Sequence, residues 1–384
     1  MTAAADLATR AADWLATRHD EMEALLKSLV DIDSNSFDKT GTDNVGDAIA
    51  AFLAADGITV TRIANDTYGD CVKAELPGRG GNAHVLMMGH RDTVFPKGTT
   101  TTRGFSKSGA IAYGPGVADM KGGLVVNCFV LRALKAAGGV DFPVVALFTS
   151  DEEIGSPSGR AVIEATARGA RAVFNSEPGR VSGNVVTGRK GGTTLDIHVT
   201  GKAAHSGANH KDGASAIGAL AAKIVKLHAL TDYDKGITTN VGVIKGGMTH
   251  NTVAPSAEAE LDIRFVELEH LPGILADVKA ILDAEDVPGT RATFTQGITF
   301  LPLEAHMSAD LFGRYKAEAA TLGFAVDGEF TGGCSDAGFT AAIGVPSLCG
   351  LGPVGGKAHT DEEFLMLDTL VPRAQALART IAGM

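Results

Sequence analysis

The chain has 384 residues, 45% of them hydrophobic and 21% charged, and its formal net charge is −11. At roughly 150 residues per domain, this length predicts two to three domains with an ample apolar core. An acidic chain without a Lys/Arg-rich run is a poor match for a nucleic-acid backbone or an anionic membrane, so we expect neither partner.

The cysteines and the N-terminus indicate a soluble cytoplasmic protein. No CxxC spacing occurs, and we expect reduced, buried thiols rather than a disulfide framework at Cys71, Cys128, Cys334 and Cys349. Residues 1–22 mix Ala with charged residues and lack the continuous apolar core of a signal peptide. No stretch approaches the roughly 18 apolar residues that a membrane span needs.

In chain order, the first half alternates between helical and strand patterns. Helices are predicted at 11–29, 45–56 and 122–137, and buried strands at 84–88, 144–148 and 172–174. The C-terminal part has the same character, with a helix at 309–322, a strand at 345–348 and a helix at 365–381. Continuously apolar strands separated by helices indicate a mostly parallel sheet that is covered on both faces.

The middle of the chain has a different pattern. Residues 194–199 and 257–265 alternate strictly between apolar and polar side chains, which is typical of half-buried strands. With helices at 214–230 and 271–284 and strands at 238–245 and 291–295, the order is βαββαβ. We therefore predict an α/β fold: one domain from residues 1–187 and 299–384, interrupted by a ferredoxin-like α+β domain at 188–298.

Three of the buried strands end in polar clusters, and parallel strands deliver such clusters to one edge of the sheet. These clusters are His90-Arg91-Asp92, Ser150 to Glu153 and Asn175-Ser176-Glu177. Asp119 opens the helix that follows the Gly-rich segment 114–118, and His359 lies in the Gly-rich stretch 350–360. Each residue alone is more typical of a structural histidine, a helix cap or an acidic turn. Their joint placement favours a functional site.

Several carboxylates in one pocket repel one another unless a cation neutralises them. Two divalent metals roughly 3.5–4 Å apart would do so and would also activate a water. Ligands from His and carboxylates without thiolates suit catalytic zinc. A phosphate-binding loop at Gly114-x-Gly116 is the alternative, but Asp119 stands where the dinucleotide fingerprint needs a third Gly.

The motifs together resemble a known family. In the expected order, the chain contains 90–94 (HRDTV), 114–123, 151–156 (DEEIGS), 204–206 (AHS), 332–336 (GGCSD) and the late His359. This set is similar to the dizinc peptidase family of glutamate carboxypeptidase (carboxypeptidase G), acetylornithine deacetylase, succinyl-diaminopimelate desuccinylase and aminoacylase. Residues 88–98 and 113–119 look most like the glutamate carboxypeptidase branch. The resemblance covers essentially the whole chain.

The resemblance implies two Zn²⁺ per subunit, with Co²⁺ or Mn²⁺ as possible substitutes. Carried over from the family motifs, Asp119 bridges the two zincs. His90 and Glu177 complete one site, and Glu153 and His359 complete the other.

The resemblance also implies roles for residues that do not bind metal. Glu152 matches the general base, which takes a proton from the attacking water and later protonates the leaving amine. Asp92 would hold the second ring nitrogen of the first zinc-binding histidine. His205 matches a residue that stabilises the tetrahedral oxyanion in a neighbouring subunit's site. Asn251 and Arg264 match positions that grip the substrate carboxylate, and Arg264 falls on the polar face of its predicted strand.

These residues predict a zinc-dependent hydrolase, a dizinc metallocarboxypeptidase that cleaves an amide bond beside a free carboxylate, with the inserted domain forming a homodimer. An N-acyl-amino-acid deacylase or desuccinylase is the alternative, because it uses the same metal centre. A catalytically silent relative would have lost the base or a ligand, and none is missing here. Arg91 stands where the family more often has an uncharged residue, so we expect extra positive charge at the pocket rim.

Overall fold

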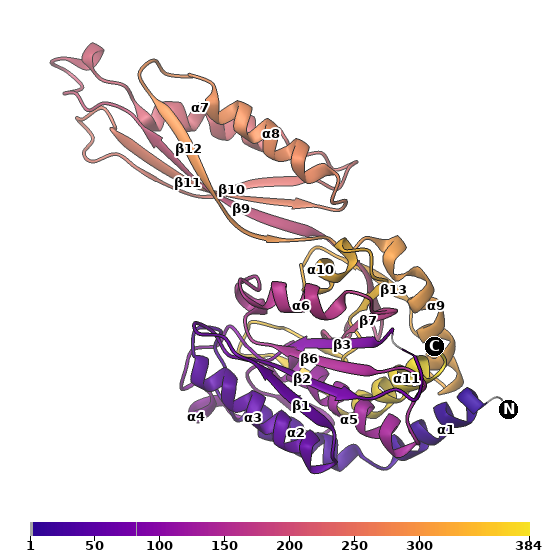
Figure 1. Cartoon of the computed structure of the whole chain (residues 1–384). Helices are drawn as coiled ribbons and strands as arrows, with labels where there is room; N and C mark the ends of the chain where they lie inside the picture. Colours follow the sequence, from indigo (N-terminus) through magenta and orange to yellow (C-terminus); the bar gives the residue numbers. More distant parts are fainter. Residues whose placement is uncertain (1–2, 82) are drawn as a thin grey trace. The chain divides into compact units, whose positions relative to one another are not determined.

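The chain folds into two compact units (Figure 1), and the computed structural model describes residues 3–81 and 83–384. The first unit contains the chain up to Arg189, together with Leu303–Thr331 and Ser335–Met384. The second contains Lys190–Pro302 and Gly332–Cys334. The sequence predicts the inserted domain at residues 188–298.

An eight-stranded sheet forms the centre of the first unit, in the order β1-β2-β6-β3-β7-β14-β8-β13. Its strands are β1 Thr59–Ile63, β2 Cys71–Leu76, β3 Val85–His90, β6 Val144–Thr149, β7 Ala172–Asn175, β8 Val185–Arg189, β13 Gly328–Thr331 and β14 Ser347–Cys349. The neighbours β6, β3, β7 and β14 run parallel, whereas β1 and β2 form an antiparallel edge. The predicted α/β class with a mostly parallel sheet is confirmed.

Helices cover both faces of this sheet (Figure 1), and β3, β6 and β7 are buried along their whole length. One face carries α1 Ala3–Ala16, α2 His19–Val30, α3 Lys39–Ala55, α5 Gly123–Ala136, α9 Ala305–Thr321 and α11 Leu370–Ala382. The other carries α6 Gly159–Ala167 and α10 Ala337–Ala342. Burial on both faces explains why the central strands are continuously apolar in sequence.

Three predicted helices have clearly different bounds in the structure, and the one predicted at 45–56 begins already at Lys39. The helix predicted at 11–29 is two helices, α1 and α2, because the chain turns at Arg18 (φ −111°, ψ 10°) without a Gly or Pro to mark the turn. The helix predicted at 365–381 begins only at Leu370, because Phe364–Met366 forms strand β16. The hydrophobic periodicity of the sequence does not reveal this three-residue strand, because the strand forms only by pairing with a partner segment far away in the chain.

That partner belongs to a small four-stranded sheet, β15-β16-β5-β4, in the first unit. Its strands are β4 Ser106–Ser108, β5 Ile111–Tyr113, β15 Gly355–Gly356 and β16 Phe364–Met366. A short helix, α4 Thr99–Arg103, precedes β4. The register pairs Phe364 with Tyr113. The loop after β5, which leads to Asp119, therefore lies beside the loop before β16, which contains His359.

The second unit is a four-stranded antiparallel sheet in the order β10-β11-β9-β12. Along the chain its elements are β9 Gly191–Thr200, α7 Ala216–His228, β10 Thr238–Gly246, β11 Ser256–Phe265, α8 His270–Asp283 and β12 Arg291–Phe300. This order confirms the predicted βαββαβ fold, and both helices lie on one face of the sheet (Figure 1). The apolar residues of β11 are buried under these helices, as the alternation predicts.

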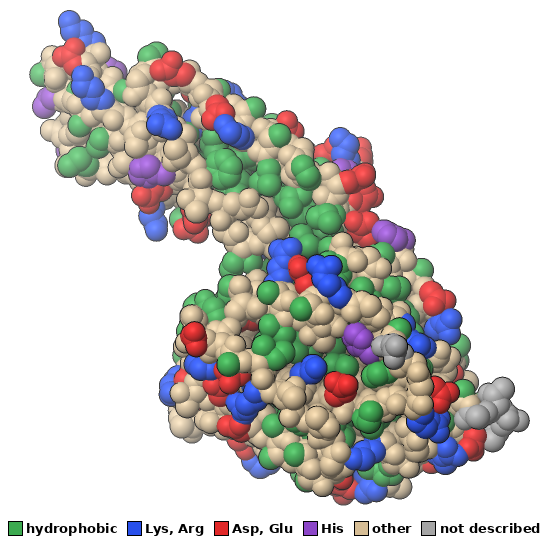
Figure 2. All heavy atoms as spheres, viewed as in Figure 1, with side chains coloured by type: hydrophobic (Ala, Val, Ile, Leu, Met, Phe, Trp, Pro, Cys, Tyr) green, Lys and Arg blue, Asp and Glu red, His purple; other side chains and the backbone are tan. Residues whose placement is uncertain are grey.

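The surface mixes both signs of charge. On the face shown in Figure 2, Lys and Arg side chains are interspersed with Asp and Glu side chains. Within the described ranges, no helix combines the length and the apolar character needed to cross a membrane.

Candidate metal centre and active site

The parallel strands at the centre of the sheet carry polar side chains to one edge. β3 ends at His90, which pairs in register with Thr149 at the end of β6. β7 ends at Asn175, two residues before Glu177. Because these strands are parallel neighbours, the segments that follow them meet at the edge where open α/β sheets bind ligands.

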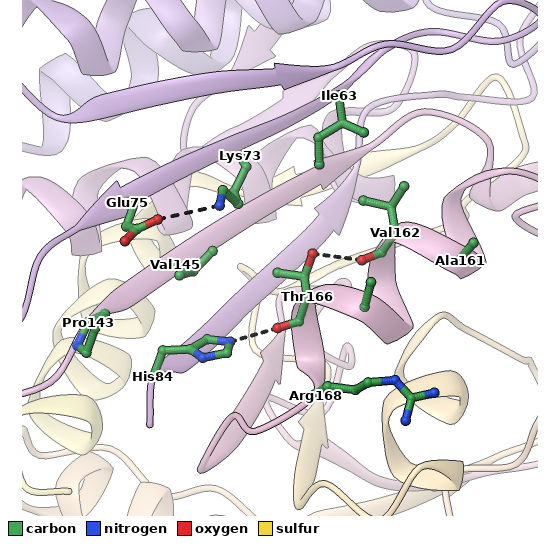
Figure 3. A pocket seen from close by; sticks show the side chains of 11 residues that line it. Ile63, Lys73, Glu75, His84, Pro143, Val145, Ala161, Val162, Thr166 and Arg168 are labelled. Carbon is green, nitrogen blue, oxygen red and sulfur yellow. Dashed lines mark hydrogen bonds and ion pairs between the residues drawn. The ribbon is translucent and has the colours of Figure 1, made fainter. Parts of the chain in front are cut away.

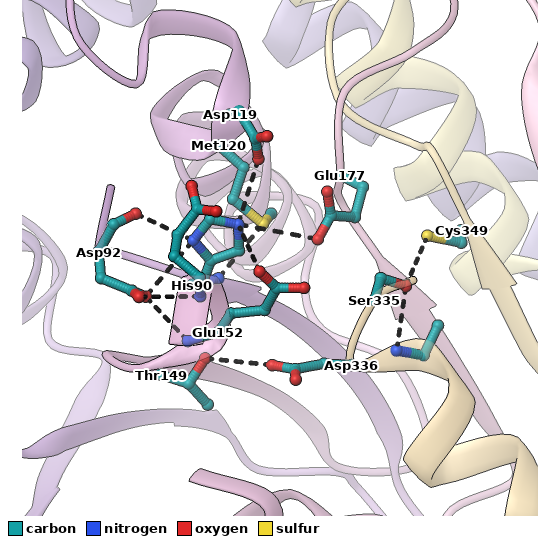
Figure 4. A network of polar contacts seen from close by, with 12 residues as sticks. His90, Asp92, Asp119, Met120, Thr149, Glu152, Glu177, Ser335, Asp336 and Cys349 are labelled. Atoms are coloured by element: carbon teal, nitrogen blue, oxygen red, sulfur yellow. Dashed lines mark hydrogen bonds and ion pairs between the residues drawn. The ribbon is translucent and has the colours of Figure 1, made fainter. Parts of the chain in front are cut away.

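The predicted metal ligands come together in two groups that share Asp119. In the first (Figure 4), His90 Nε2 lies 3.2 Å from Asp119 Oδ1 and 3.8 Å from Glu177 Oε1. In the second, His359 Nε2 lies 3.5 Å from Asp119 Oδ2 and 3.0 Å from Glu153 Oε2. The candidate ligand atoms within each group lie within 4.8 Å of one another. The two oxygens of Asp119 thus face different histidines, as a carboxylate bridging two cations requires.

The donor set fits divalent cations, since it consists of imidazoles and carboxylates without a thiolate. Glu177 Oε1 is buried and has no hydrogen-bond partner among the described residues, which is uncommon for a buried oxygen. Burial and the Asp119 carboxylate raise the pKa of Glu177, and burial raises the pKa of Glu153 to about 7. Bound cations would supply the positive charge that favours the ionised carboxylates.

Glu152 lies beside these ligands but belongs to neither group. Its Oε2 atom lies 3.8 Å from His90 Nε2 (Figure 4), and the residue is only 8% exposed. Burial raises its pKa, as do the neighbouring Glu177, Asp336 and Glu153 carboxylates, although His90 opposes the rise. A carboxyl group with a raised pKa is suited to accept a proton and return it near neutral pH.

Asp92 is fully buried and holds two parts of the site. His90 Nδ1 lies 3.0 Å from the Asp92 backbone carbonyl oxygen and 3.4 Å from Oδ1. The Nδ1 proton can therefore be donated to Asp92, which leaves Nε2 to face Asp119. The Asp92 carboxylate also accepts hydrogen bonds from the backbone N–H groups of Glu152 (3.2 Å) and Glu153 (3.1 Å). One side chain thus links His90 to the acidic pair.

A cleft of about 390 Å³ opens beside Asp119 and Glu177. Its wall also carries three basic side chains, Arg180, Arg189 and Lys357, and a third acidic side chain, Glu329. Arg189 Nη2 lies 3.8 Å from Glu177 Oε2, and Arg180 Nε lies 3.4 Å from Glu329 Oε2. Acidic and basic side chains are therefore equal in number in this wall, until cations engage Asp119 and Glu177.

The remaining predicted site residues belong to the second unit. His205 Nδ1 accepts hydrogen bonds from the backbone N–H groups of Gly207 and Ala208, each at 3.1 Å. Its ring proton is consequently on Nε2, which makes that atom a donor. The Asn251 backbone carbonyl accepts the Ser206 N–H at 3.0 Å, so Asn251 lies next to the His205 loop.

Arg264 lies on the polar face of β11, as predicted, and is not simply solvated. Its Nε donates to the Asp262 carboxylate at 2.9 Å, and its Nη1 lies 3.1 Å from Cys334 Sγ. These contacts fix the orientation of the guanidinium group.

Comparison with known proteins decides the family. Residues 86–383, well over half of the chain, match the sequence profile described as Peptidase family M20/M25/M40. The chain belongs to this family. The resemblance seen in the motifs is confirmed, and the protein is an enzyme of a metal-dependent group of peptidases and amidohydrolases.

Curated members of the M20 family are similar over much of the chain. Carboxypeptidase G2 from Pseudomonas sp. (strain RS-16) is 32% identical and aligns with 94% of this chain and 89% of its own length. Succinyl-diaminopimelate desuccinylase from Cupriavidus taiwanensis is 32% identical over 68% of this chain and 70% of its own. Acetylornithine deacetylase from Myxococcus xanthus is also 32% identical, over 66% of this chain and 67% of its own length.

Solved structures share the M20 fold. Aminopeptidase PepT from Bacillus cereus has a TM-score of 0.79 at 22% identity, covering 95% of this chain and 98% of its own. The M20 family metallo-carboxypeptidase Sso-CP2 from Sulfolobus solfataricus has a TM-score of 0.78 at 17% identity, covering 94% and 98%. At these identities the likeness concerns the fold alone.

The expectation that Arg91 adds charge to the pocket rim of this M20 enzyme is wrong. Arg91 is fully buried, and its guanidinium donates to the backbone carbonyls of Thr149, Thr42 and Asp70. All three acceptors are main-chain oxygens, so the Arg91 side chain holds together the backbone near Thr42, Asp70 and Thr149. The position of Arg91 at the end of a strand does not by itself show whether its side chain points into the protein or toward the pocket.

Two buried acidic residues near the M20 site received no role from the sequence. Asp336 accepts a hydrogen bond from the Ser156 hydroxyl, and burial raises its pKa to about 7. Glu363 is fully buried and bonds to the loop that carries Asp119. Asp336 is the last residue of the GGCSD motif, which could have marked it, whereas no sequence signal marks Glu363.

A larger hollow of about 580 Å³ lies elsewhere on the first unit (Figure 3). Several of its polar groups pair with one another: Lys73 Nζ lies 3.5 Å from Glu75 Oε2, and His84 Nε2 lies 2.8 Å from the Thr166 carbonyl oxygen. His84 immediately precedes β3, so this hollow is at the amino ends of the strands. The site is expected at the opposite ends.

Proposed function

We propose that this chain is a zinc-dependent hydrolase that cleaves an amide bond next to a free carboxylate and releases a C-terminal amino acid such as glutamate. The observation that carries the proposal is Asp119, whose two carboxylate oxygens face His90 and His359 at 3.2 and 3.5 Å, with Glu152 alongside. The similarity to Carboxypeptidase G2 over 94% of the chain supports the substrate class.

In this proposal, His90 and Glu177 would hold one zinc, Glu153 and His359 would hold the other, and Asp119 would contribute to both. When bound, the cations would supply Lewis-acid chemistry, polarising the scissile carbonyl and making the attacking water more acidic. The buried histidine and carboxylates contribute a fixed set of donor atoms, since Asp92 sets the orientation of His90.

Glu152 performs the proton transfers in the proposed reaction. Its carboxylate accepts a proton from the attacking water and then donates that proton to the amide nitrogen as the C–N bond breaks. Its raised pKa favours both halves of this transfer, because a base near neutral pH also becomes an effective acid once protonated.

Residues of the second unit bind the substrate in the proposed reaction. Arg264, whose Nε and Nη2 contact Asp262, would pair with the substrate carboxylate through its remaining guanidinium protons, and Asn251 would add an amide donor. The Nε2 proton of His205 is available to stabilise the developing oxyanion, since Nδ1 is already used as an acceptor.

The cleft beside Asp119 favours a second candidate function, that of a deacylase with an anionic acyl group. Arg180, Arg189 and Lys357 line this cleft, and with Asp119 and Glu177 engaged by cations, Glu329 would be its remaining acidic side chain. A carboxylate at the far end of the acyl group, as in an N-succinyl amino acid, would meet positive charge there. An uncharged acyl group of the same length would gain no such electrostatic attraction.

A hydrolysis screen of the zinc-loaded protein tests both candidates. The substrates are an N-acyl-glutamate, its C-terminal amide, and N-succinyl and N-butanoyl forms of one amino acid. Carboxypeptidase function predicts hydrolysis of the N-acyl-glutamate, inhibition by a chelator, and a rise in KM on Arg264→Ala that the amide analogue does not show. Preference for the N-succinyl over the N-butanoyl substrate would support the deacylase. Activity that survives complete removal of divalent metal would contradict both.

A further inference from the structure

Glu363 lies inside the first unit, between the His359 loop and strand β16. The residue is fully buried. Phe364 at the start of β16 pairs with Tyr113 at the end of β5. Because this pairing is antiparallel, Glu363 lies against the segment that follows Tyr113, and that segment leads to Asp119.

Three backbone N–H groups of this segment donate to the Glu363 carboxylate. The Gly116 N–H donates to Oε2 at 3.0 Å, and the N–H groups of Ala118 and Asp119 both donate to Oε1 at 2.9 Å. Gly116 has a φ of +72°, a backbone conformation that favours glycine. Without an acceptor, these three groups would be left buried and unpaired.

A buried lysine belongs to the same segment. Lys121 is almost completely buried, and its Nζ donates to the Ile32 carbonyl oxygen at 2.8 Å. Burial lowers the pKa of Lys121 to about 7, and the Glu363 carboxylate opposes this shift. Burial also raises the pKa of Glu363 to about 7, so the geometry of its three accepted hydrogen bonds, rather than its charge, carries the argument.

We propose that Glu363 is a positioning residue for the metal centre, holding the Asp119 segment and the His359 loop at the separation that the second ligand group needs. This inference rests on the proposed metal-dependent function. Glu363 follows His359 by four residues in the chain and bonds directly to the Asp119 backbone. A single side chain therefore ties together the two segments that supply ligands to that group.

The test is zinc titration of the metal-free, full-length protein and its Glu363→Gln variant against a competing chelator. A glutamine has one acceptor oxygen, and its NH₂ group would face a backbone N–H, so the Asp119 segment should shift. We expect the variant to stay folded by circular dichroism while its affinity for one zinc falls about 10–100-fold, as for other residues that support metal ligands. Glu362→Gln is the matched control, because Glu362 is the adjacent, exposed carboxylate and pairs with Lys357. Its zinc affinity should equal that of the unchanged protein.

A residue that only stabilises the fold would lower the melting temperature of the metal-free protein and leave the zinc affinity of the folded protein unchanged. That result for Glu363→Gln would overturn the inference. If Glu363→Gln does not fold, Glu363→Asp decides in its place, since it keeps the charge but is one methylene too short to reach all three donors. Unchanged zinc affinity in folded Glu363→Asp would then be the contrary result. Wild-type protein that binds zinc but cleaves none of the amides would contradict the proposed function and leave this comparison intact.

Discussion

Glu152 and Glu153 are neighbours in the sequence, but the contacts of their side chains differ, as the proposed roles of base and metal ligand require. Glu153 Oε2 lies 3.0 Å from His359 Nε2 and belongs to the second ligand group. Glu152 lies near His90 and belongs to no group. The Asp92 carboxylate accepts a hydrogen bond from the backbone N–H group of each residue. The backbone contacts of the two glutamates are thus alike, and the difference between them lies in the directions of their side chains.

Exchanging each glutamate for glutamine separates these tasks. Glu152→Gln should keep both zincs and lose about 10²–10⁴-fold in kcat, since an amide can no longer transfer the proton. Glu153→Gln should instead lower the zinc content or the affinity of one site. Elemental analysis of the purified variants, together with kcat, measures both effects. The same zinc content in the two variants would contradict this division of labour.

Site residues that lie just after a strand end can be identified from the sequence. Residues whose contacts are made by distant segments of the chain are much harder to identify. His90 and Glu177 could be predicted because each lies within three residues of the end of an apolar run, and such runs end at a common edge. Glu363 could not, because its partner Gly116 is 247 residues away in the chain and is reached only through the β5–β16 pairing. The burial of Arg91 was missed for the same reason, since its acceptors come from separate segments.

At the element scale, the start of helix α5 packs directly on the loop after β7. A Cβ atom added at Gly123 would lie 1.8 Å from the Ser176 carbonyl oxygen. Asn127, one turn further along α5, accepts a hydrogen bond from the Ser176 hydroxyl at 2.6 Å. Ser176 immediately precedes Glu177, so the contact with α5 lies directly beside a candidate metal ligand.

Gly123→Ala should therefore disturb the metal centre as well as stability. The methyl group must push α5 away from the β7 loop, and overpacking of this kind costs about 1–3 kcal/mol. We expect a lower melting temperature and weaker zinc binding through displacement of Glu177. Thermal unfolding and zinc titration measure the two effects.

Gly313→Ala in α9 is the control with the opposite expected sign. No atom lies within 4 Å of a Cβ built at Gly313, and the residue is exposed. Alanine should stabilise this helix by about 0.4–1 kcal/mol, because it restricts the unfolded chain, and should leave zinc binding unchanged. Equal destabilisation by both substitutions would show that the contact between Gly123 and Ser176 is not the cause.

The elements that could be predicted are those whose pattern is local. The central strands and the βαββαβ order follow from apolar runs and alternation in the sequence. The break between α1 and α2 could not be predicted, because Thr17 and Arg18 carry no turn signal. Strands of only two or three residues, such as β15 and β16, depend on pairing between distant segments, which periodicity does not record.

At the scale of the whole molecule, the second unit has features expected of a subunit interface. Its sheet ends in the exposed edge strand β10, where Val243 and Ile244 are 40% and 63% exposed. Helix α7 exposes Ile217 and Val225, at 46% and 72%. Contiguous exposed apolar patches mark association surfaces, whereas single exposed apolar residues are common. The homodimer predicted from the sequence would use one such surface of the second unit on both subunits, about a two-fold axis.

Mixed dimers test whether His205 acts in the neighbouring subunit's site. If it does, each active site combines Glu152 of one chain with His205 of the other, so Glu152→Gln and His205→Ala homodimers should both be nearly inactive. In a mixed dimer, one site then contains both substitutions and the other contains neither. With equal amounts and random exchange, half of the dimers are mixed and each regains one of two sites, so recovered activity should be about a quarter of wild type. The measurement is the hydrolysis rate after subunit exchange, with exchange verified by differently tagged chains. Absence of recovery despite complete exchange would place His205 in its own chain's site or outside catalysis.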